Sequence, residues 1–299
     1  MHYFVMGGTG FVGTALLEHL QAKGHRVSAL VREGSSLKVG GKGIEAVPGN
    51  AMKEGEWQKV AAEADVVVNL VGASIFRRWT EDAKKKITTT RVVSTRRAVQ
   101  AMRKTGGQTF VCANAVGFYG DRGDEILVEE SGPGQGFLAE VCKQWQQEAR
   151  EAESKGHRVV LARFAPVLGK GGGVMGQMLP VFKLGLGGPL GSGKQWFAWV
   201  HMTDLVRAIE FAGENHEITG PVNVCSPHPV TNKDFTGSLA AKLHRPAFFK
   251  VPAVVLKTAL GEAATMVLDS VRCVPGKLQS SGFSFKYPRL EQALDEILK

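Results

Sequence analysis

The chain of 299 residues has only four cysteines and no long apolar run, and both features restrict the classes of protein to which it can belong. Its four cysteines, at positions 112, 142, 225 and 273, form no CxxC pair, so the sequence predicts neither a metal site nor a disulfide framework. No stretch of 18 apolar residues is present, so we expect no membrane-spanning helix and no membrane partner. The first residues reach glycine too early for a signal peptide, and together these features predict a cytoplasmic protein.

Positive charge is in excess, and it is concentrated in one segment. The chain has 37 basic and 28 acidic residues, a net charge of +9, and residues 77–104 hold ten of the basic side chains with only two acids. A solvated helix flank is one reading, and an anion site near Arg77, Arg78 and Arg91 is another. Nucleic-acid contact is a third, weaker reading, because Trp79 is the segment's one aromatic residue for stacking.

Apolar runs alternate with helical patterns through the first half of the chain. Strands are predicted at residues 3–6, 26–31, 44–47, 66–70, 109–113 and 158–163, and helices at 11–23, 80–104 and 137–154. This rhythm predicts an α/β fold with a parallel sheet covered by helices on both faces, over residues 1–165. Residues 166–299 are predicted to form a smaller, irregular lobe. That lobe begins with ten glycines in residues 169–193 and includes helices at 203–212, 232–243 and 289–298 and a strand at 222–224.

A glycine-rich turn joins the first predicted strand to the first predicted helix. The segment Gly7-Gly8-Thr9-Gly10-Phe11-Val12-Gly13 fits the spacing that lets backbone approach a pyrophosphate closely at a helix N-terminus. We therefore expect a dinucleotide to contact Gly7, Thr9, Gly10, Phe11 and Val12. An ordinary glycine-rich βα turn is the alternative.

The ends of the next strands supply further candidate cofactor contacts. Arg32 follows the second strand, where a guanidinium suits the 2′-phosphate of NADP, whereas Glu33 beside it would suit NAD. NADP is therefore the favoured cofactor, with NAD as the alternative. Asn50 follows the third strand, where an amide can meet adenine, and Leu70-Val71-Gly72 follow the fourth, where backbone passes a cofactor.

These motifs resemble the extended short-chain dehydrogenase/reductase superfamily, and more narrowly an atypical branch of the NAD(P)-dependent epimerase/dehydratase family. That branch is labelled nucleoside-diphosphate-sugar epimerase or cell-division-inhibitor-like. The resemblance covers nearly the whole chain and is carried by residues 7–13, 69–72, 78–80, 115–120, 163, 187–193, 199–201, 204–205, 220–223 and 282–283. It implies a Rossmann domain, a bound nicotinamide dinucleotide, and a C-terminal domain of the branch's own from about residue 245.

The resemblance also implies a Ser or Thr, a Tyr and a Lys as catalytic groups, and here the pattern is incomplete. Lys143 fits the lysine that would hold the ribose, but Ala139 stands where the YxxxK pattern has tyrosine, and Asn114 stands where the branch has serine. Tyr119 can supply a phenol, although in related proteins this tyrosine shapes the pocket. Asn114 either binds a substrate carbonyl or hydrogen-bonds backbone. The candidate catalytic residues are therefore Asn114, Tyr119 and Lys143.

Two further residues are candidates for contact with a substrate. Trp199 and His201 belong to an aromatic run that precedes a predicted helix. Thr203 is expected to cap this helix, and Asp204 suits the positive end of its dipole. Packing in the core of the second lobe is the alternative role for both Trp199 and His201.

The function predicted from these features is an NADP(H)-binding oxidoreductase or epimerase that acts on a small carbonyl or sugar-like substrate. A non-catalytic NADP-binding regulator or sensor is the alternative, favoured by the missing tyrosine. An RNA-binding relative of the same fold is a third hypothesis, motivated by residues 77–104. A small-molecule substrate is the expected partner, nucleic acid is disfavoured, and a homodimer is left open.

Overall fold

The computed structural model describes residues 1–37 and 43–299 and confirms the expected α/β architecture. Its central sheet has seven parallel strands in the order β11-β7-β5-β4-β1-β2-β3. In chain order these are β1 (His2–Met6), β2 (Arg26–Val31), β3 (Ile44–Pro48), β4 (Val66–Asn69), β5 (Thr109–Ala115), β7 (Arg158–Phe164) and β11 (Gly220–Val224). The winding direction reverses between β1 and β4, and in open α/β sheets ligands bind at such a point, beyond the carboxyl ends of the strands.

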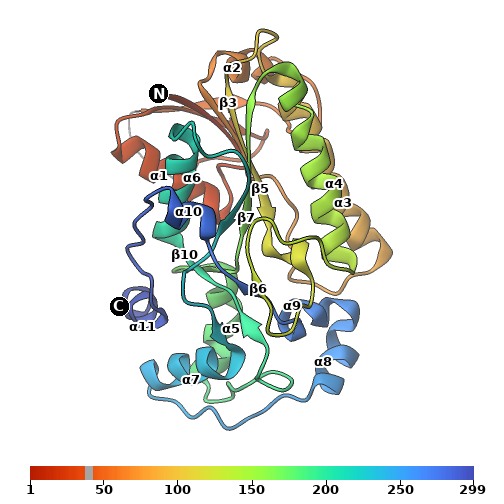
Figure 1. Ribbon diagram of the computed structural model, residues 1–299, viewed down its shortest axis with the longest axis vertical. Helices are drawn as coiled ribbons and strands as arrows, with labels where there is room; N and C mark the ends of the chain where they lie inside the picture. The colour runs from red at the N-terminus through yellow and green to blue at the C-terminus, as the bar shows by residue number, and fades with distance from the viewer. Residues whose placement is uncertain (38–42) are drawn as a thin grey trace.

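Helices cover both faces of the sheet, as buried, nearly continuous apolar strands require. On one face α1 (Phe11–Ala22) and α6 (Met202–Glu214) pack against each other and against the strands. On the other face lie α2 (Trp57–Glu63), α3 (Glu81–Ala101) and α4 (Phe137–Arg150). Figure 1 shows these two helical layers on opposite sides of the strands.

Most of the remaining elements form a lobe beyond the carboxyl ends of the strands, in the lower half of Figure 1. Its helices are α5 (Gly173–Lys183), α7 (Asn232–Lys242), α8 (Ala253–Leu260), α9 (Thr265–Leu268) and α11 (Leu290–Leu298). Helix α10 (Gly276–Ser280) instead lies against β11 and beside α6. The short strands of the lobe are β6 (Ile126–Leu127), β8 (Val167–Leu168), β9 (Trp196–Phe197), β10 (Val200–His201), β12 (Val230–Thr231) and β13 (Arg272–Cys273). Three 3₁₀ turns complete the elements: η1 (Val116–Tyr119), η2 (Glu153–Lys155) and η3 (Gly261–Ala264).

Residues on the lobe side of the expected boundary near 165 also contribute to the sheet layer. Strand β11 pairs with β7, and α6 packs on α1. The lobe has its own core, which α5, α7 and α11 build around Trp199 and Phe235. The chain therefore leaves the sheet after β7, returns to it for α6 and β11, and leaves it again. Among the described residues, no helix combines the length and the apolar character needed to cross a membrane.

Candidate functional site

The glycine-rich turn joins β1 to α1 at the carboxyl edge of the sheet. Gly7 has φ of +86°, a left-handed conformation that favours glycine, and its carbonyl oxygen accepts a hydrogen bond from the Gly10 amide at 3.0 Å. Gly10 is the N-cap of α1 without a side-chain cap, and it is exposed. The first amides of α1, from Phe11 onward, therefore lack intrahelical partners and suit an anion.

The turn leaves no room for larger side chains. A Cβ on Gly13 would lie 2.1 Å from the Gly7 carbonyl oxygen, and a Cβ on Gly7 would lie 3.0 Å from the Leu70 carbonyl carbon. The loop after β4 thus runs directly against the turn. Gly7 and Gly13 are required for this close approach of backbone to backbone, which is the packing that a dinucleotide-binding turn needs.

Asn69 organises the loop after β4 from a fully buried position. Its amide nitrogen donates to Ser94 Oγ and Thr95 Oγ1 of α3 at 3.2 and 2.9 Å, and its Oδ1 accepts from the Val71 amide at 3.1 Å. These bonds fix the path of Leu70, Val71 and the exposed Gly72 beside the glycine turn.

Arg91 of α3 holds the next part of this loop. Its Nη1 donates to the carbonyl oxygens of Ala73 at 3.1 Å and Ile87 at 3.0 Å, and its Cζ would lie 3.0 Å from a Cβ on Gly72. Burial lowers the pKa of Arg91. This arginine, a candidate for anion binding on sequence grounds, is thus bonded to the backbone of the loop and of its own helix.

Arg32 and Asn50 lie at the carboxyl ends of β2 and β3. Arg32 directly follows Val31, and its side chain is exposed at the same edge as the glycine turn. Asn50 is half-buried, and its Oδ1 accepts from the Met52 amide at 2.9 Å, so its carbonyl group fixes a local turn and its NH₂ group is the part that could meet an adenine.

Asn114 is committed to backbone contacts. It is 2% exposed, its amide nitrogen donates to the Cys142 carbonyl oxygen at 3.1 Å, and its Oδ1 lies 2.9 Å from the Ala115 amide. The residue therefore ties the end of β5 to α4. Of the two roles expected for it, this geometry supports the hydrogen bond to backbone.

Lys143 lies on α4 with its ammonium group at the surface. Its Nζ is 2.5 Å from Glu140 Oε2, and the side chain is 43% exposed. One helical turn earlier, Ala139 is buried, with 1% of its surface exposed. The position that carries tyrosine in the YxxxK pattern is thus a small core residue.

Tyr119 is fully buried in a polar network. Its hydroxyl accepts from Arg163 Nη1 at 2.8 Å and lies 2.7 Å from Asn223 Oδ1 and 2.9 Å from the Val128 carbonyl oxygen. Burial raises the pKa of Tyr119, with the Cys273 thiol as a second cause. A phenol in this state is a poor proton donor near neutral pH, so the geometry supports the structural role.

The basic segment is partly neutralised by its own surroundings. Five of its ten basic side chains have partners within the chain: Lys84 contacts Glu262, Arg91 contacts Ala73, Arg96 contacts Glu148, Arg97 contacts Glu54, and Arg103 contacts Ala62 and Ala64. Arg77 and Arg78 are exposed on the loop that leads into α3. The continuous positive face that an RNA-binding surface needs is reduced accordingly.

Trp199 and His201 serve the core and the start of α6. Trp199 is fully buried, and its Nε1 donates to the His228 carbonyl oxygen at 3.1 Å. The N-cap of α6 is His201, whose Nδ1 accepts from the Thr203 amide at 3.1 Å. The expectation that Thr203 caps this helix is therefore wrong, because the helix begins one residue earlier and the imidazole performs the task of a hydroxyl.

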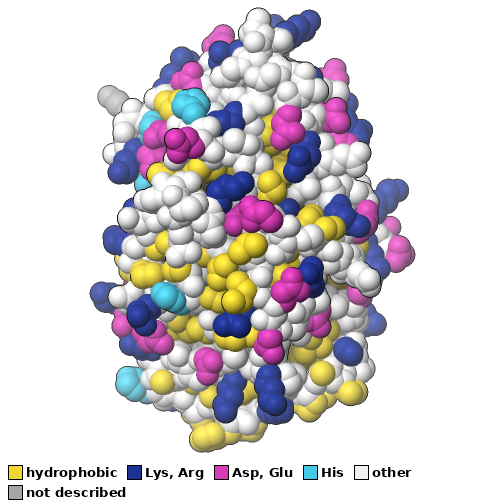
Figure 2. All heavy atoms as spheres, viewed as in Figure 1, with side chains coloured by type: hydrophobic (Ala, Val, Ile, Leu, Met, Phe, Trp, Pro, Cys, Tyr) yellow, Lys and Arg dark blue, Asp and Glu magenta, His cyan; other side chains and the backbone are white. Residues whose placement is uncertain are grey.

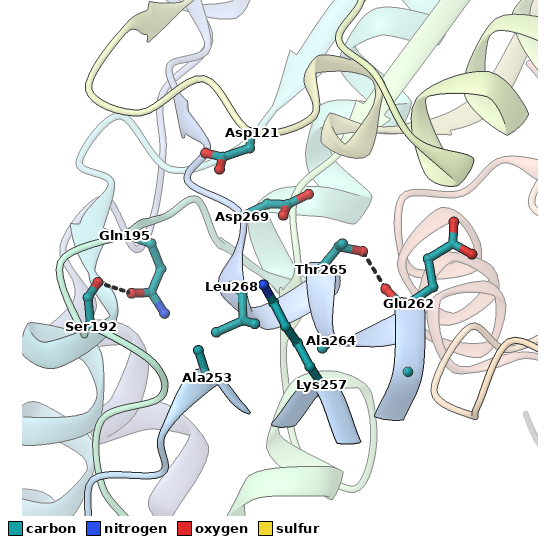
Figure 3. Close-up of a pocket in the computed structure, with 11 residues that line it drawn as sticks. Asp121, Ser192, Gln195, Ala253, Lys257, Glu262, Ala264, Thr265, Leu268 and Asp269 are labelled. Atoms are coloured by element: carbon teal, nitrogen blue, oxygen red, sulfur yellow. Dashed lines mark hydrogen bonds between the residues drawn. The ribbon is translucent and has the colours of Figure 1, made fainter. Parts of the chain in front are cut away.

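A pocket of about 600 Å³ lies between the lobe and the loop after β5. Figure 3 shows Asp121 and Asp269 at its upper end and Lys257 pointing into it from α8, with Gln195 and Thr265 on opposite walls. Burial and the Asp121 carboxylate raise the pKa of Asp269 to about 6. The pocket thus combines an ammonium group, an amide and the carboxylates of Asp121, Glu262 and Asp269, a set that can bind hydroxyl and carbonyl groups.

The pocket adjoins the loop that continues from Gly72. Its wall residue Glu262 lies 2.5 Å from Lys84 of α3, and Ala263 of η3 packs with Trp79 and Ile87. Sequence reasoning missed Lys257 and Asp269, which lie in no motif, and it also missed Asp121, which directly follows the Tyr119-Gly120 pair. The pocket and the glycine turn therefore lie on the same, carboxyl side of the sheet.

Two family models match most of the chain, one after the other. The model described as "NAD dependent epimerase/dehydratase family" matches residues 3–225, and that described as "Domain of unknown function (DUF1731)" matches residues 251–297. The first covers the seven-stranded sheet from the second residue of β1, and the second covers α8 to α11 almost completely.

The chain also resembles relatives over nearly its whole length. The chain is 37% identical over 300 residues to an epimerase family protein of Arabidopsis thaliana, a chloroplastic SDR39U1 homolog, with 99% of this chain and 86% of the relative covered. It is 35% identical to the Bacillus subtilis epimerase family protein YfhF, with 100% and 98% covered. The crystal structure of human epimerase family protein SDR39U1 (isoform 2) with NADPH superposes with a TM-score of 0.84 at 32% identity, covering 99% of both chains.

Proposed function

The chain belongs to the NAD-dependent epimerase/dehydratase family, and from this premise we propose that it binds NADP(H) and acts as an oxidoreductase or epimerase on a small carbonyl or sugar-like substrate. The observation that carries the proposal is the tight glycine turn, whose Gly13 cannot accept a Cβ and whose helix amides point at the carboxyl edge of the sheet. The human relative that was crystallised with NADPH supports the choice of cofactor.

The residues present fit a dinucleotide with a 2′-phosphate. The amides at the start of α1 would hold the pyrophosphate, and the exposed guanidinium of Arg32 would pair with the 2′-phosphate. Leu70, Val71 and Gly72 would line the path of the cofactor, held there by Asn69. When bound, the nicotinamide ring supplies or accepts a hydride at its C4.

The pocket beside α8 and η3 is the proposed substrate site. Lys257 would bind a carbonyl or phosphate oxygen, and Asp121 would accept hydrogen bonds from hydroxyl groups. Asp269, with its pKa raised to about 6 by burial and Asp121, can hold a proton at its carboxyl oxygen in one step and release it in another near neutral pH. It is our candidate for the proton exchange that Ala139 cannot perform.

A test of the cofactor compares NADPH with NADH in binding titrations that follow cofactor fluorescence. A guanidinium–phosphate contact contributes about 1.5–3 kcal/mol, so Arg32→Ala should weaken NADPH binding about 10- to 100-fold and leave NADH unchanged. Arg26→Ala is the matched control, because Arg26 is exposed at the opposite end of the same strand. Equal affinity of both cofactors for the unaltered protein, with no effect of Arg32→Ala, would refute the 2′-phosphate contact.

A regulator that binds NADPH without turnover is the second candidate, and the buried Ala139 favours it. Turnover can be tested by following NADPH oxidation with a panel of small aldehydes, ketones and nucleotide sugars. Oxidation that Asp269→Asn abolishes while NADPH binding persists would support the enzyme. NADPH binding with no oxidation, and no exchange of substrate hydrogen with solvent, across the whole panel would favour the regulator.

A further inference from the structure

Exposed apolar side chains gather at one end of the molecule. In the described part of the chain, seven of the ten exposed large hydrophobic residues lie in two short segments. We call this group the apolar tip: Val181, Leu184, Leu186, Phe248, Phe249, Val254 and Val255. Phe248 is 84% exposed, Leu184 75% and Val254 74%, values that packing in the core does not explain.

The two segments lie side by side. The Val251 amide donates to the Pro189 carbonyl oxygen at 3.0 Å, and the Gly191 amide donates to the Val251 carbonyl oxygen at 2.8 Å. In Figure 1 the loop from α7 to α8, which carries Phe248 and Phe249, forms the lower end of the longest axis of the molecule. Figure 2 shows apolar surface reaching that end, with basic side chains just above it. The apolar tip therefore protrudes from the molecule.

The two segments that carry the apolar tip hold charges of one sign. Residues 181–194 and 244–257 contain no aspartate or glutamate and five cations: Lys183, Lys194, Arg245, Lys250 and Lys257. Within the described residues, none of the five forms an ion pair with a carboxylate. This differs from α3, where glutamates neutralise several of the cations. The tip thus offers protruding apolar groups on two segments whose charged side chains are all cations outside ion pairs.

We propose that the apolar tip binds the surface of an anionic lipid bilayer. Phenylalanine and leucine side chains enter the boundary between headgroups and acyl chains, while lysine and arginine contact the negative headgroups. A second copy of this chain fits less well, because symmetric contact of two tips would bring the same five cations together. Sequence analysis predicted no membrane partner from the lack of a spanning segment, a criterion that does not address interfacial binding.

The bilayer would lie next to the proposed substrate pocket. Helix α8 carries Val254 and Val255 of the apolar tip on its exposed side and presents Ala253 and Lys257 to the pocket. Binding at the tip would therefore place the pocket within a few side chains of the lipid headgroups. The membrane proposal itself is independent of the proposed function, since it depends on surface residues outside the glycine turn.

The test is co-sedimentation of the full chain with vesicles. We expect binding to phosphatidylcholine vesicles that contain about one-third phosphatidylglycerol, weak binding to pure phosphatidylcholine, and loss of binding as salt rises from about 0.1 M to about 0.5 M. The double variant Phe248→Ser, Phe249→Ser should reduce the partition coefficient about 100-fold, and Lys250→Glu about tenfold.

Matched controls distinguish loss of binding at the apolar tip from the effect of removing an exposed aromatic ring or reversing a charge elsewhere on the surface. Phe76→Ser removes an aromatic ring that is 47% exposed elsewhere, and Lys85→Glu reverses a charge on α3; both should leave binding unchanged. Equal binding by the tip variants and the controls would overturn the proposal, as would no binding to anionic vesicles. A dimer in light scattering that the double serine variant dissociates would overturn it in favour of a second copy. Unchanged midpoints of thermal unfolding would confirm that all variants are folded.

Discussion

Arg163 shows how one buried charge organises the residues next to the site. Its guanidinium, 2% exposed, donates to Tyr119, to the Glu129 carbonyl oxygen and to Gln146, and it stacks over the Phe118 ring with Cζ 3.7 Å from the ring centroid. A buried cation needs such partners, because an unpaired one would be strongly destabilising. The tyrosine therefore serves as an acceptor for this arginine.

Removal of that acceptor gives a residue-scale prediction. Tyr119→Phe should lower the free energy of unfolding by about 1–3 kcal/mol, since a buried N–H of Arg163 loses its partner, while NADPH affinity stays the same. Urea denaturation and a binding titration measure the two quantities. Tyr287→Phe, at a half-buried ring, is the matched control and should change stability by less than about 0.5 kcal/mol. Unchanged stability in Tyr119→Phe would contradict the structural role.

Buried histidines predict the response to acid. Burial lowers the pKa of His201, against the opposing effect of Glu296, and burial also lowers the pKa values of His2 and His157. Near pH 6.5 the unfolded chain then binds more protons than the folded one, so stability should fall as the pH drops from 7.5 to about 6. His201→Asn keeps a capping side chain and removes one titrating group.

The variant should therefore show a smaller loss of stability over this range. The difference in slope is at most about 1.4 kcal/mol per pH unit, the value for one proton. Urea denaturation of both proteins at several pH values measures this difference in slope. Asp269 has the opposite effect, because its raised pKa favours the folded state in acid, but it contributes equally to both proteins and cancels in the comparison. Identical slopes would show that His201 titrates alike in both states.

Some contacts between single residues could be predicted from the sequence, and others could not. The glycine turn and Arg32 could be predicted as cofactor contacts because spacing along the chain reflects their geometry. The thiols of Cys225 and Cys273, 48 positions apart, lie 3.8 Å from each other in the core, and Asp121 raises the pKa of Asp269 across 148 positions. Such pairs depend on how the lobe returns to the sheet, which no local pattern encodes.

At the scale of elements, strands and amphipathic helices of the sheet layer were predictable and the glycine-rich helix was not. Each strand of the first half lies where its apolar run placed it, and α3 begins after Thr80, whose side chain caps it. Helix α5 contains two glycines and Pro180, and no helix was predicted in this glycine-rich segment. It is helical because Met175 and Phe182 are buried in the lobe core, and tertiary packing outweighs poor helix propensity there.

The turn between β1 and α1 gives the element-scale prediction. Gly13→Ala would place a Cβ 2.1 Å from the Gly7 carbonyl oxygen, so the turn must open and NADPH affinity should fall at least about 100-fold. Gly237→Ala is the matched control, because it lies exposed within α7 with open space around its Cβ. It should leave NADPH binding intact and raise stability by about 0.5–1 kcal/mol. Normal NADPH binding by Gly13→Ala would contradict the turn as the cofactor site.

At the scale of the whole molecule, buried carboxylates join the C-terminal segment to the sheet layer. Asp204 at the start of α6, 1% exposed, accepts from the amides of Lys286 and Tyr287 at 2.7 and 2.8 Å. Glu129 accepts from the amides of Asn223 in β11 and Lys277 in α10 at 3.0 and 3.1 Å. The last part of the chain is therefore bonded into the layer that holds the glycine turn.

These links predict that the chain unfolds as one unit. Far-UV circular dichroism and tryptophan fluorescence should give the same urea midpoint, although Trp57 and Trp145 belong to the sheet layer and Trp199 to the lobe. NADPH at about 100 times its dissociation constant should raise both midpoints together, by about 2.7 kcal/mol of stability. Asp204→Ala leaves two part-buried amides without acceptors and should cost about 1–3 kcal/mol, still in one transition. If the lobe folds independently, the two probes will separate in this variant and NADPH will move only the transition of the sheet layer.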